Sequence, residues 1–494
     1  MLKQFAKNTL VYGIATLVSR GISLLLVPLY TRWLSPTEYG VLDIALVSTT
    51  LASVLMTLEV AQGLARSYIE TDDPDEKASF ASTALWFTVG GFTLFVLAGL
   101  VALRPLTAWL TGTADAPAIR GDPAVTVAAL ALVASAGVFY FGQTLLRWEL
   151  APMKHAWASI AASAVTVALS VLLVTGMRAG VEGAMWAQTA GNAAGAALGL
   201  WFVRGTVARG FSWARCREML AFSLPLVPSG VGVFVSVYVD RIAIKRLMTL
   251  GDVGVFGVGF RIVAVLGLLM SIFQGSLTPL VYKNHRAAET PAQVARIFRL
   301  FVAAALLLCA ALTLFAREIL AVVTTPPYYG AWRVIPLLGP AILLANMYIF
   351  TPGLGIARRT GAIAAVNVTA AVLNTALNFV LIPHLGITGA ALSTFLSAAG
   401  TFAVYMSVGQ RLYPIPHHWR ALAAGVVATI GVYAAALAAA AWWPAISPAL
   451  VAAKLLVLVA LAAFMAVAGL VSTPELMAAR TFLGLARSRL RQGT

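Results

Sequence analysis

Charged residues are scarce in this chain. Of its 494 residues only 11% are Asp, Glu, Lys or Arg, whereas 60% are hydrophobic, and the mean hydropathy is +0.89. A soluble protein of this length needs far more charge to cover its surface. The composition therefore excludes a soluble globular protein and indicates a polytopic membrane protein.

Cysteines and enzyme motifs are also lacking. The two cysteines, Cys216 and Cys309, lie far apart, so we expect neither a disulfide framework nor a metal site. The five histidines have no nucleophile or carboxylate at a catalytic spacing, and there is no Walker motif. No loop is long enough for the clustered catalytic acids of a membrane glycosyltransferase or polymerase. We therefore expect that the protein is not an enzyme and that it binds no cofactor.

Long apolar runs, in contrast, recur along the whole chain. A membrane-spanning helix needs about 20 residues at a rise of 1.5 Å per residue, and about fourteen runs reach that length. We predict spans at 8–31, 38–65, 79–103, 123–146, 155–176, 181–203, 219–246, 252–281, 296–316, 333–356, 361–382, 387–409, 420–443 and 449–471. The sequence thus predicts an all-α polytopic membrane protein.

The basic residues predict the orientation of these spans. With the N-terminus inside, 22 of the 34 Lys and Arg residues fall on the cytoplasmic side and 8 in outer loops. Because basic residues are enriched in cytoplasmic loops, both termini are predicted to be cytoplasmic. The remaining four, Arg20, Arg241, Arg261 and Lys454, lie inside predicted spans.

The net charge of +16 is spread between spans instead of forming one soluble patch. This distribution favours anionic lipid headgroups and an anionic substrate as partners over nucleic acid. At the C-terminus, residues 473–494 mix apolar and basic residues, which predicts an amphipathic helix on the inner leaflet. A solvated tail is the alternative.

The sequence also repeats itself. "RWLSPTEYGV" at 32–41 aligns with "RLMTLGDVGV" at 246–255, so that an arginine, an acid, a glycine and a valine recur in register. Further on, the same order of matches continues with "AQG" at 61–63 and "FQG" at 273–275, then "GVEGAMWA" at 180–187 and "GITGAALS" at 386–393. The order and spacing of these matches indicate a duplication.

The duplication predicts two six-helix lobes, 1–210 and 211–412, followed by two extra helices in 413–472. Because six crossings return the chain to the same side, the lobes should be parallel repeats about an axis along the membrane normal. Transporters built from repeats place the substrate site between them and open it alternately to each side.

The same residues resemble a known family. "KNTLVYGIATLVSRGISLLLVPLYTRWLSPTEYG", the later "YVDRIAIKRLMTLGDVGVFG" and the "G-x-x-G-A" start of spans six and twelve are similar to the polysaccharide flippase branch of the multidrug/oligosaccharidyl-lipid/polysaccharide exporter (MOP) superfamily. The resemblance implies a bacterial inner-membrane flippase with a cationic cavity between two lobes. It implies an undecaprenyl-pyrophosphate-linked oligosaccharide as cargo, with a polysaccharide polymerase and chain-length machinery as further candidate partners.

Arg20 is the strongest candidate for contact with a pyrophosphate. It lies near the middle of the first predicted span, where a cation costs about 2.5–3.5 kcal/mol on translocon scales. Its guanidinium binds phosphate oxygens in pairs and stays charged at any working pH. Ser19-Arg20 resembles a Ser-Arg pair in the first helix of lipid II flippases of the same superfamily. An ion pair with Glu59 is the alternative role.

The second predicted span carries Glu59, Gln62 and Arg66 on one helical face, which should line the cavity because lipid offers these groups no partner. Arg66 lies near the cytoplasmic end, where it would meet an incoming pyrophosphate or simply flank the span. Gln62 and Gln274, matched by the repeat, could bind sugar hydroxyls or hydrogen-bond to neighbouring helices.

Spans seven and eight contribute Asp240, Arg241 and Arg261. The two arginines could extend a series of phosphate-binding cations from the cytoplasmic to the outer side. Alternatively, Asp240 and Arg261 could form an interhelical ion pair.

Two questions stay open at the level of sequence. Glu59 or Asp240 could bind H⁺ or Na⁺ as a coupling ion, or the membrane potential could act on the cargo's charge, at ~2.3 kcal/mol per elementary charge per 100 mV. The cargo is also open, because a multidrug or cation antiporter and a lipid II flippase belong to the same superfamily. Buried arginines favour an anionic cargo, whereas an antiporter of cationic drugs would favour acidic pockets.

Overall fold

The computed structural model describes residues 25–471 except 113, 118, 208, 209, 358 and 443–446. Most of the predicted span 8–31, with Arg20 in it, and the predicted amphipathic helix 473–494 lie outside the described residues. Across the described part of the chain the regular structure is entirely helical, which confirms the all-α prediction.

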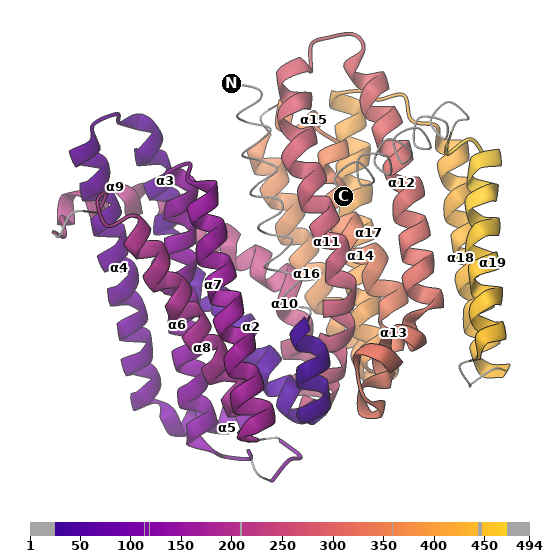
Figure 1. Cartoon of the computed structure of the whole chain (residues 1–494). Helices are drawn as coiled ribbons and strands as arrows, with labels where there is room; N and C mark the ends of the chain where they lie inside the picture. The colour runs from indigo at the N-terminus through magenta and orange to yellow at the C-terminus, as the bar shows by residue number, and fades with distance from the viewer. Residues whose placement is uncertain are drawn as a thin grey trace, which may run out of the picture.

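Figure 1 shows two helical bundles that follow one another along the chain. The first bundle contains α2 (Pro36–Thr57), α3 (Val60–Glu70), α4 (Pro74–Val101), α5 (Leu103–Thr111), α6 (Pro123–Trp148), α7 (Pro152–Ser170), the π-helical turn η1 (Val171–Gly176) and α8 (Gly180–Phe202). The second contains η2 (Leu224–Leu226), α10 (Val227–Leu247), α11 (Leu250–Asn284), α12 (Thr290–Leu314), α13 (Ala316–Val323), η3 (Pro326–Arg333), α14 (Ile335–Asn346), η4 (Met347–Phe350), α15 (Gly353–Ile356), α16 (Thr360–Leu385) and α17 (Ile387–Leu412).

Three of the described helices lie outside these two bundles. α9 (Trp213–Ser223) connects them, and α18 (Trp419–Trp442) and α19 (Pro448–Val467) follow the second bundle and flank it beside α12 (Figure 1). Lys454 of α19 forms an ion pair with Glu318 of α13, so the outer helix is also held by charge.

Eleven of the described helices are long and apolar enough to cross a membrane, or twelve if one bent pair counts as a span. The bent pair joins η3 to the segment Ile335–Phe350 at an angle of 54°, within the predicted span 333–356. α8 is not among the eleven, although it has 23 residues. The protein is therefore a multi-pass membrane protein, and the count of fourteen spans stays a prediction.

The two bundles meet at the end of the molecule where α5 and α13 lie and separate toward the end where α3 and α9 lie (Figure 1). We call these ends the α5/α13 side and the α3/α9 side. At the α5/α13 side one hydrophobic core contains residues of both bundles, among them Tyr39, Leu42, Phe256 and Tyr328. Tyr328 packs edge-on against Tyr39 at 5.7 Å and donates a hydrogen bond to the carbonyl of Leu34.

The repeated sequence motif forms the starts of the two helices that meet there. Ser35 caps α2 and Glu38 completes its capping box, and Thr249 and Asp252 do the same for α11. Such a cap stabilises a helix by about 1 kcal/mol. A Cβ atom on Gly40 would lie 1.9 Å from the carbonyl oxygen of Leu250, so the absence of side chains lets the helices touch through their backbones.

The predicted span 38–65 is wrong as a single continuous helix. Leu58 and Glu59 have φ values of 48° and 57° and separate α2 from α3. Left-handed conformations cost roughly 1–2 kcal/mol each in residues other than glycine. The pair nevertheless persists here, where Glu59 borders the cavity described below.

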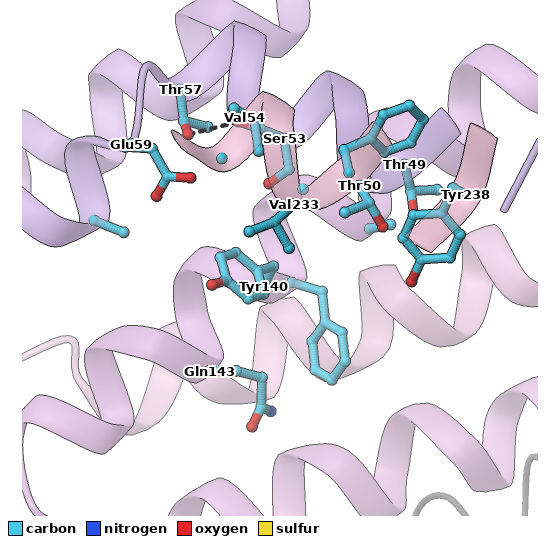
Figure 2. Close-up of a pocket in the computed structure, with 16 residues that line it drawn as sticks. Thr49, Thr50, Ser53, Val54, Thr57, Glu59, Tyr140, Gln143, Val233 and Tyr238 are labelled. Carbon is cyan, nitrogen blue, oxygen red and sulfur yellow. Dashed lines mark hydrogen bonds between the residues drawn. The ribbon is translucent and has the colours of Figure 1, made fainter. Parts of the chain in front are cut away.

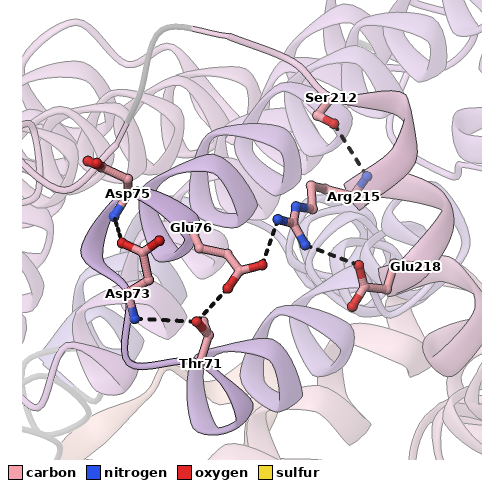
Figure 3. A network of polar contacts seen from close by, with 7 residues as sticks. All are labelled: Thr71, Asp73, Asp75, Glu76, Ser212, Arg215 and Glu218. Carbon is pink, nitrogen blue, oxygen red and sulfur yellow. Dashed lines mark hydrogen bonds and ion pairs between the residues drawn. The ribbon is translucent and has the colours of Figure 1, made fainter.

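α9 packs on the first bundle although it lies after the predicted lobe boundary at 210. A Cβ atom on Gly63 of α3 would meet the backbone of Met219 of α9 at 2.6 Å. Figure 3 shows Arg215 of α9 in an ion pair with Glu76 of α4, at 2.6 Å, while Glu76 also accepts a hydrogen bond from Thr71. The connector is therefore fixed to the first bundle.

Candidate functional site

A cavity of about 560 Å³ lies between the two bundles. Its walls come from α2 and the start of α3, from α6, and from α10 of the second bundle (Figure 2). The lining residues are Thr49, Thr50, Ser53, Val54, Thr57, Glu59, Ala61, Ala136, Gly137, Phe139, Tyr140, Gln143, Gly230, Val233, Phe234 and Tyr238. Both bundles therefore contribute to the walls of this cavity.

The lining combines hydroxyl, amide and aromatic groups with one carboxylate, that of Glu59. Figure 2 shows Tyr140 extending from α6 toward α2 and α10, with Gln143 further along α6. The Oε1 atom of Gln143 accepts a hydrogen bond from Ser159 at 3.2 Å, whereas its buried Nε2 has no hydrogen-bond partner among the described residues. Groups of this kind bind a polar, uncharged ligand such as a sugar.

A cluster of three charged residues lies near this cavity. Arg241 of α10 pairs with Asp43 of α2 at 3.5 Å, and Arg261 of α11 pairs with the other carboxylate oxygen of Asp43 at 3.6 Å. The side chains of Arg241 and Asp43 are 2% and 7% exposed, and that of Arg261 is 22% exposed. One carboxylate therefore faces two guanidinium groups, and the buried carboxylate of Asp240 also interacts electrostatically with Arg241.

Aromatic rings surround the two arginines. The guanidinium carbon of Arg241 lies 4.0 Å from the ring centre of Phe260 and 5.1 Å from that of Phe256, and that of Arg261 lies 5.1 Å from Tyr39. Cation–π contacts of this kind contribute about 0.5–2 kcal/mol each. They offset part of the cost of burying two guanidinium groups.

The cluster and the cavity have two helices in common, α2 and α10. Asp43 precedes Thr49 by six residues, or about 9 Å along α2. On α10, Tyr238 lines the cavity and its ring centre lies 5.7 Å from the guanidinium carbon of Arg241. Along α2, the charged cluster thus lies between the α5/α13 side and the cavity.

Asp240 is adjacent to Arg241 but belongs to a different site. Its Oδ1 accepts a hydrogen bond from Asn378 and its Oδ2 accepts one from Thr394, both at 2.7 Å. Asn378 also donates to Asn374. Since Arg261 pairs with Asp43, the Asp240–Arg261 ion pair considered from the sequence is not the arrangement observed.

Asn374 and Thr394 also line a second cavity, of about 570 Å³, inside the second bundle. Its polar lining is uncharged and includes Asn346, Asn367 and Tyr405. The carboxylate of Asp240 is buried and is linked to this second cavity through its hydrogen bond from Thr394.

The other candidate residues are dispersed. Arg66 is on the surface, with its side chain 52% exposed, and forms an ion pair with Glu70 at 2.7 Å. Gln62 is exposed on the same helix, and Gln274 donates hydrogen bonds to Asn346. The structure thus brings Arg241 and Arg261 together, with Glu59 on the cavity wall, and leaves Arg66 apart.

Sequence reasoning missed Asp43, the residue that joins the two arginines. A signal was present, because Asp43 is an acid inside a predicted span and lies two residues after Val41, the last residue of the repeated motif. The aromatic and hydroxyl lining of α6, which includes Tyr140, gave no comparable signal, because such residues are common in membrane-spanning helices.

Comparisons with known proteins agree with this architecture. A family model described as "Polysaccharide biosynthesis protein" matches residues 5–285. Among curated proteins, none matches the sequence significantly.

Several solved structures share the fold. The lipid II flippase MurJ in an inward closed conformation has a TM-score of 0.68 at 11% identity, and the match covers 92% of this chain and 98% of that one. An inward-facing multidrug resistance MATE family transporter of the MOP superfamily has a TM-score of 0.63 at 15% identity, with 79% and 94% covered. A MOP superfamily transporter from Pyrococcus furiosus, described as having a binding pocket of reverse polarity, has a TM-score of 0.53 at 14% identity, with 83% and 96% covered.

Proposed function

The chain belongs to the polysaccharide biosynthesis protein family, and from that membership we propose that it is a flippase for a lipid-linked oligosaccharide. The proposed cargo is an undecaprenyl-pyrophosphate-linked oligosaccharide. The flippase carries it from the cytoplasmic to the periplasmic leaflet of a bacterial inner membrane, where a polysaccharide polymerase would use it.

The observation that carries the proposal is the Arg241–Arg261 pair next to a cavity between the lobes whose lining includes hydroxyl, amide and aromatic groups. Arginine is the side chain best suited to bind phosphate oxygens in pairs. The hydroxyl, amide and aromatic groups of the cavity suit sugar rings. Together they match the two chemically distinct parts of the headgroup, and an unpaired anion could not cross ~30 Å of hydrocarbon without such a site.

The distribution of basic residues supports an orientation with the α3/α9 side in the cytoplasm. In that orientation the bundles are apart on the cytoplasmic side and joined on the periplasmic side (Figure 1). Cargo would enter the cavity from the cytoplasm, and closure of that side would accompany opening of the other.

A flipping assay in proteoliposomes tests the proposal. Purified protein is reconstituted with a fluorescent polyprenyl-pyrophosphate-linked sugar, and the fraction of headgroups accessible to an impermeant quencher is followed over time. We expect Arg261→Gln to lose flipping and Arg261→Lys to retain part of it, since lysine keeps the charge without the fork. Arg104→Gln, a basic residue outside the site, is the matched control.

The rival functions give different results in the same vesicles. A multidrug antiporter would move a cationic dye against its gradient, and Arg261→Gln would not impair this transport. A lipid II flippase would move lipid II in preference to other lipid-linked sugars. Full flipping activity of Arg261→Gln would contradict the proposal.

We further propose Asp240 as the site of a coupling ion, either Na⁺ or H⁺. Asn378 places a buried Oδ1 without a hydrogen-bond partner among the described residues next to the carboxylate, and Asn374 and Thr394 add further oxygens. Hard cations prefer oxygen ligands of this kind. An imposed Na⁺ or pH gradient should accelerate flipping, and Asp240→Asn should abolish the acceleration. Gradient-stimulated flipping in Asp240→Asn would contradict this assignment.

A further inference from the structure

We propose that Asp43 occupies the phosphate site of Arg241 and Arg261 while no cargo is bound, and that a phosphate group of the cargo displaces it. This inference rests on the proposed function, because it concerns the regulation of the same site. The displacement releases the first bundle from the second on the α5/α13 side, so that this side opens only when cargo is present.

The three charged side chains come from both bundles. Asp43 comes from α2 of the first bundle, whereas Arg241 and Arg261 come from α10 and α11 of the second. The carboxylate is therefore an ionic link between the bundles at the point where they meet. Any anion that takes its place on the arginines removes that link.

The contacts between Asp43 and the two arginines are long. At 3.5 and 3.6 Å both ion pairs are longer than good hydrogen bonds. The Nε atom of Arg241 and the Oδ2 atom of Asp43 are buried, and neither has a hydrogen-bond partner among the described residues. Two guanidinium groups thus offer more hydrogen-bond donors than one carboxylate satisfies.

A glycine of α11 leaves space for the carboxylate of Asp43. A Cβ atom on Gly257 of α11 would lie 2.9 Å from Cγ and Oδ2 of Asp43 and 3.1 Å from Oδ1. A side chain at position 257 would force the carboxylate to move. Because position 257 has no side chain, Asp43 can reach across the interface to the arginines.

A phosphate group competes well for this site. It presents more oxygens and more negative charge than a carboxylate, and arginine binds it through two parallel hydrogen bonds. Once the arginines hold phosphate, Asp43 is a buried anion without a cation, which is strongly unfavourable. The carboxylate is stabilised again only if α2 moves away and exposes it to water.

A disulfide between the bundles can measure this closure. A Cβ atom on Gly251 of α11 would lie 3.5 Å from Oγ1 of Thr37 of α2, so cysteines at both positions are close enough to pair. The pair Thr37→Cys/Gly251→Cys is made in full-length protein with Cys216 and Cys309 replaced by serine. The rate of disulfide formation in proteoliposomes then reports how often the α5/α13 side is closed.

The probe is farnesyl pyrophosphate, with farnesol as its control for the apolar tail. We expect farnesyl pyrophosphate to slow disulfide formation by between about 5- and 150-fold, the usual range of coupling between a ligand and a conformational change, and farnesol to leave it unchanged. Asp43→Asn should form the disulfide slowly without any ligand and should no longer respond to pyrophosphate. Gly257→Ala should behave in the same way, because it displaces the carboxylate without removing it.

Two further variants complete the test. Asp43→Glu keeps the charge and should retain the response to farnesyl pyrophosphate. Glu182→Gln removes a half-buried carboxylate of α8 outside the cluster and should match the parent protein.

Two results would overturn the inference: parental disulfide formation in Asp43→Asn, or no effect of farnesyl pyrophosphate on the parent. If Asp43→Asn closes normally while lipid-linked sugar is still flipped, the inference fails and the proposed function stands. If farnesyl pyrophosphate slows disulfide formation in the parent protein while no lipid-linked sugar is flipped, the proposed function fails and the role of Asp43 stands.

Discussion

Gly40 of α2 and Gly254 of α11, which occupy equivalent positions in the two sequence repeats, lie against each other where the bundles meet. A Cβ atom on Gly40 would lie 3.1 Å from the backbone nitrogen of Gly254, and a Cβ atom on Gly254 would lie 3.0 Å from that of Gly40. The contact is thus nearly symmetric. The duplicated motif encodes the closure between the lobes, with Asp43 one turn further along α2.

Replacing Gly40 by alanine should weaken this closure. The new methyl group would lie 1.9 Å from the carbonyl oxygen of Leu250 and 2.9 Å from its carbon, so the backbones must separate. Overpacking of this kind costs about 1–3 kcal/mol. We expect a lower unfolding temperature in detergent and a reduced rate of flipping.

Gly90→Ala is the matched control for that variant. Gly90 lies in α4, and a Cβ atom there would have no neighbouring atom within 4 Å. It should leave the unfolding temperature and flipping unchanged. Equal behaviour of Gly40→Ala and Gly90→Ala would show that the contact between the glycines does not hold the lobes together.

Arg66 should act on cargo entry and not on stability. Its ion pair with Glu70 is exposed, and such pairs contribute about 0–1 kcal/mol. We expect Arg66→Ala to slow flipping at low cargo concentration, with little change at saturation and a difference that shrinks in high salt. Glu70→Gln, which frees the cation, should not slow flipping. A loss of maximal rate in Arg66→Ala would instead indicate a role deeper in the transport path.

Arg20 lies outside the described residues, and the sequence alone carries its prediction. Arg20→Ala should abolish export of polysaccharide while the protein remains inserted, and Arg20→Lys should retain part of the activity because the charge persists. Export is measured by complementation of a deletion strain, and membrane abundance by immunoblot. Full complementation by Arg20→Gln at low expression would rule out a substrate role.

His417, in the connection between α17 and α18, should make stability depend on pH. Burial, with a smaller effect of the neighbouring His418, lowers the pKa of His417 from 6.5 to about 4. The unfolded chain therefore takes up a proton near pH 6.5 and the folded protein only near pH 4, so stability falls as the pH drops through this window.

The matched variant is His417→Phe. The imidazole packs on Phe298 at 4.6 Å and neither ring nitrogen has a hydrogen-bond partner among the described residues, so phenylalanine can replace it without losing a hydrogen bond. The unfolding temperature of the variant should decline less than that of the parent between pH 6.5 and 5. Identical slopes would assign the pH dependence to other groups.

The fold was largely predictable because hydropathy and helix length respond to the same membrane thickness. The breaks within the predicted helices were not predictable from the sequence. Leu58 and Glu59 adopt left-handed conformations without a glycine or proline to signal them, since their conformation depends on contacts made after the helices assemble.

The site was predictable in its residue types but not in its pairing. Arg241 and Arg261 were recognisable as buried cations, whereas their shared partner, Asp43, lies about 200 positions earlier in the sequence. Only the packing of α2 against α10 and α11 decides which acid meets which base. For the same reason, Asp240 could be placed beside Arg241 in the sequence and still bind Asn378 and Thr394.

The attachment of α9 to the first bundle determines where the molecule can bend. Arg215 and Met219 hold this helix on α4 and α3, yet its chain continues directly into α10, whose far end carries one of the cluster's arginines. We therefore expect that any rocking of one lobe on the other would bend the chain at the short 3₁₀ stretch Leu224–Leu226 between the two helices. A stiffer stretch at this position should then slow the change in the relative orientation of the lobes.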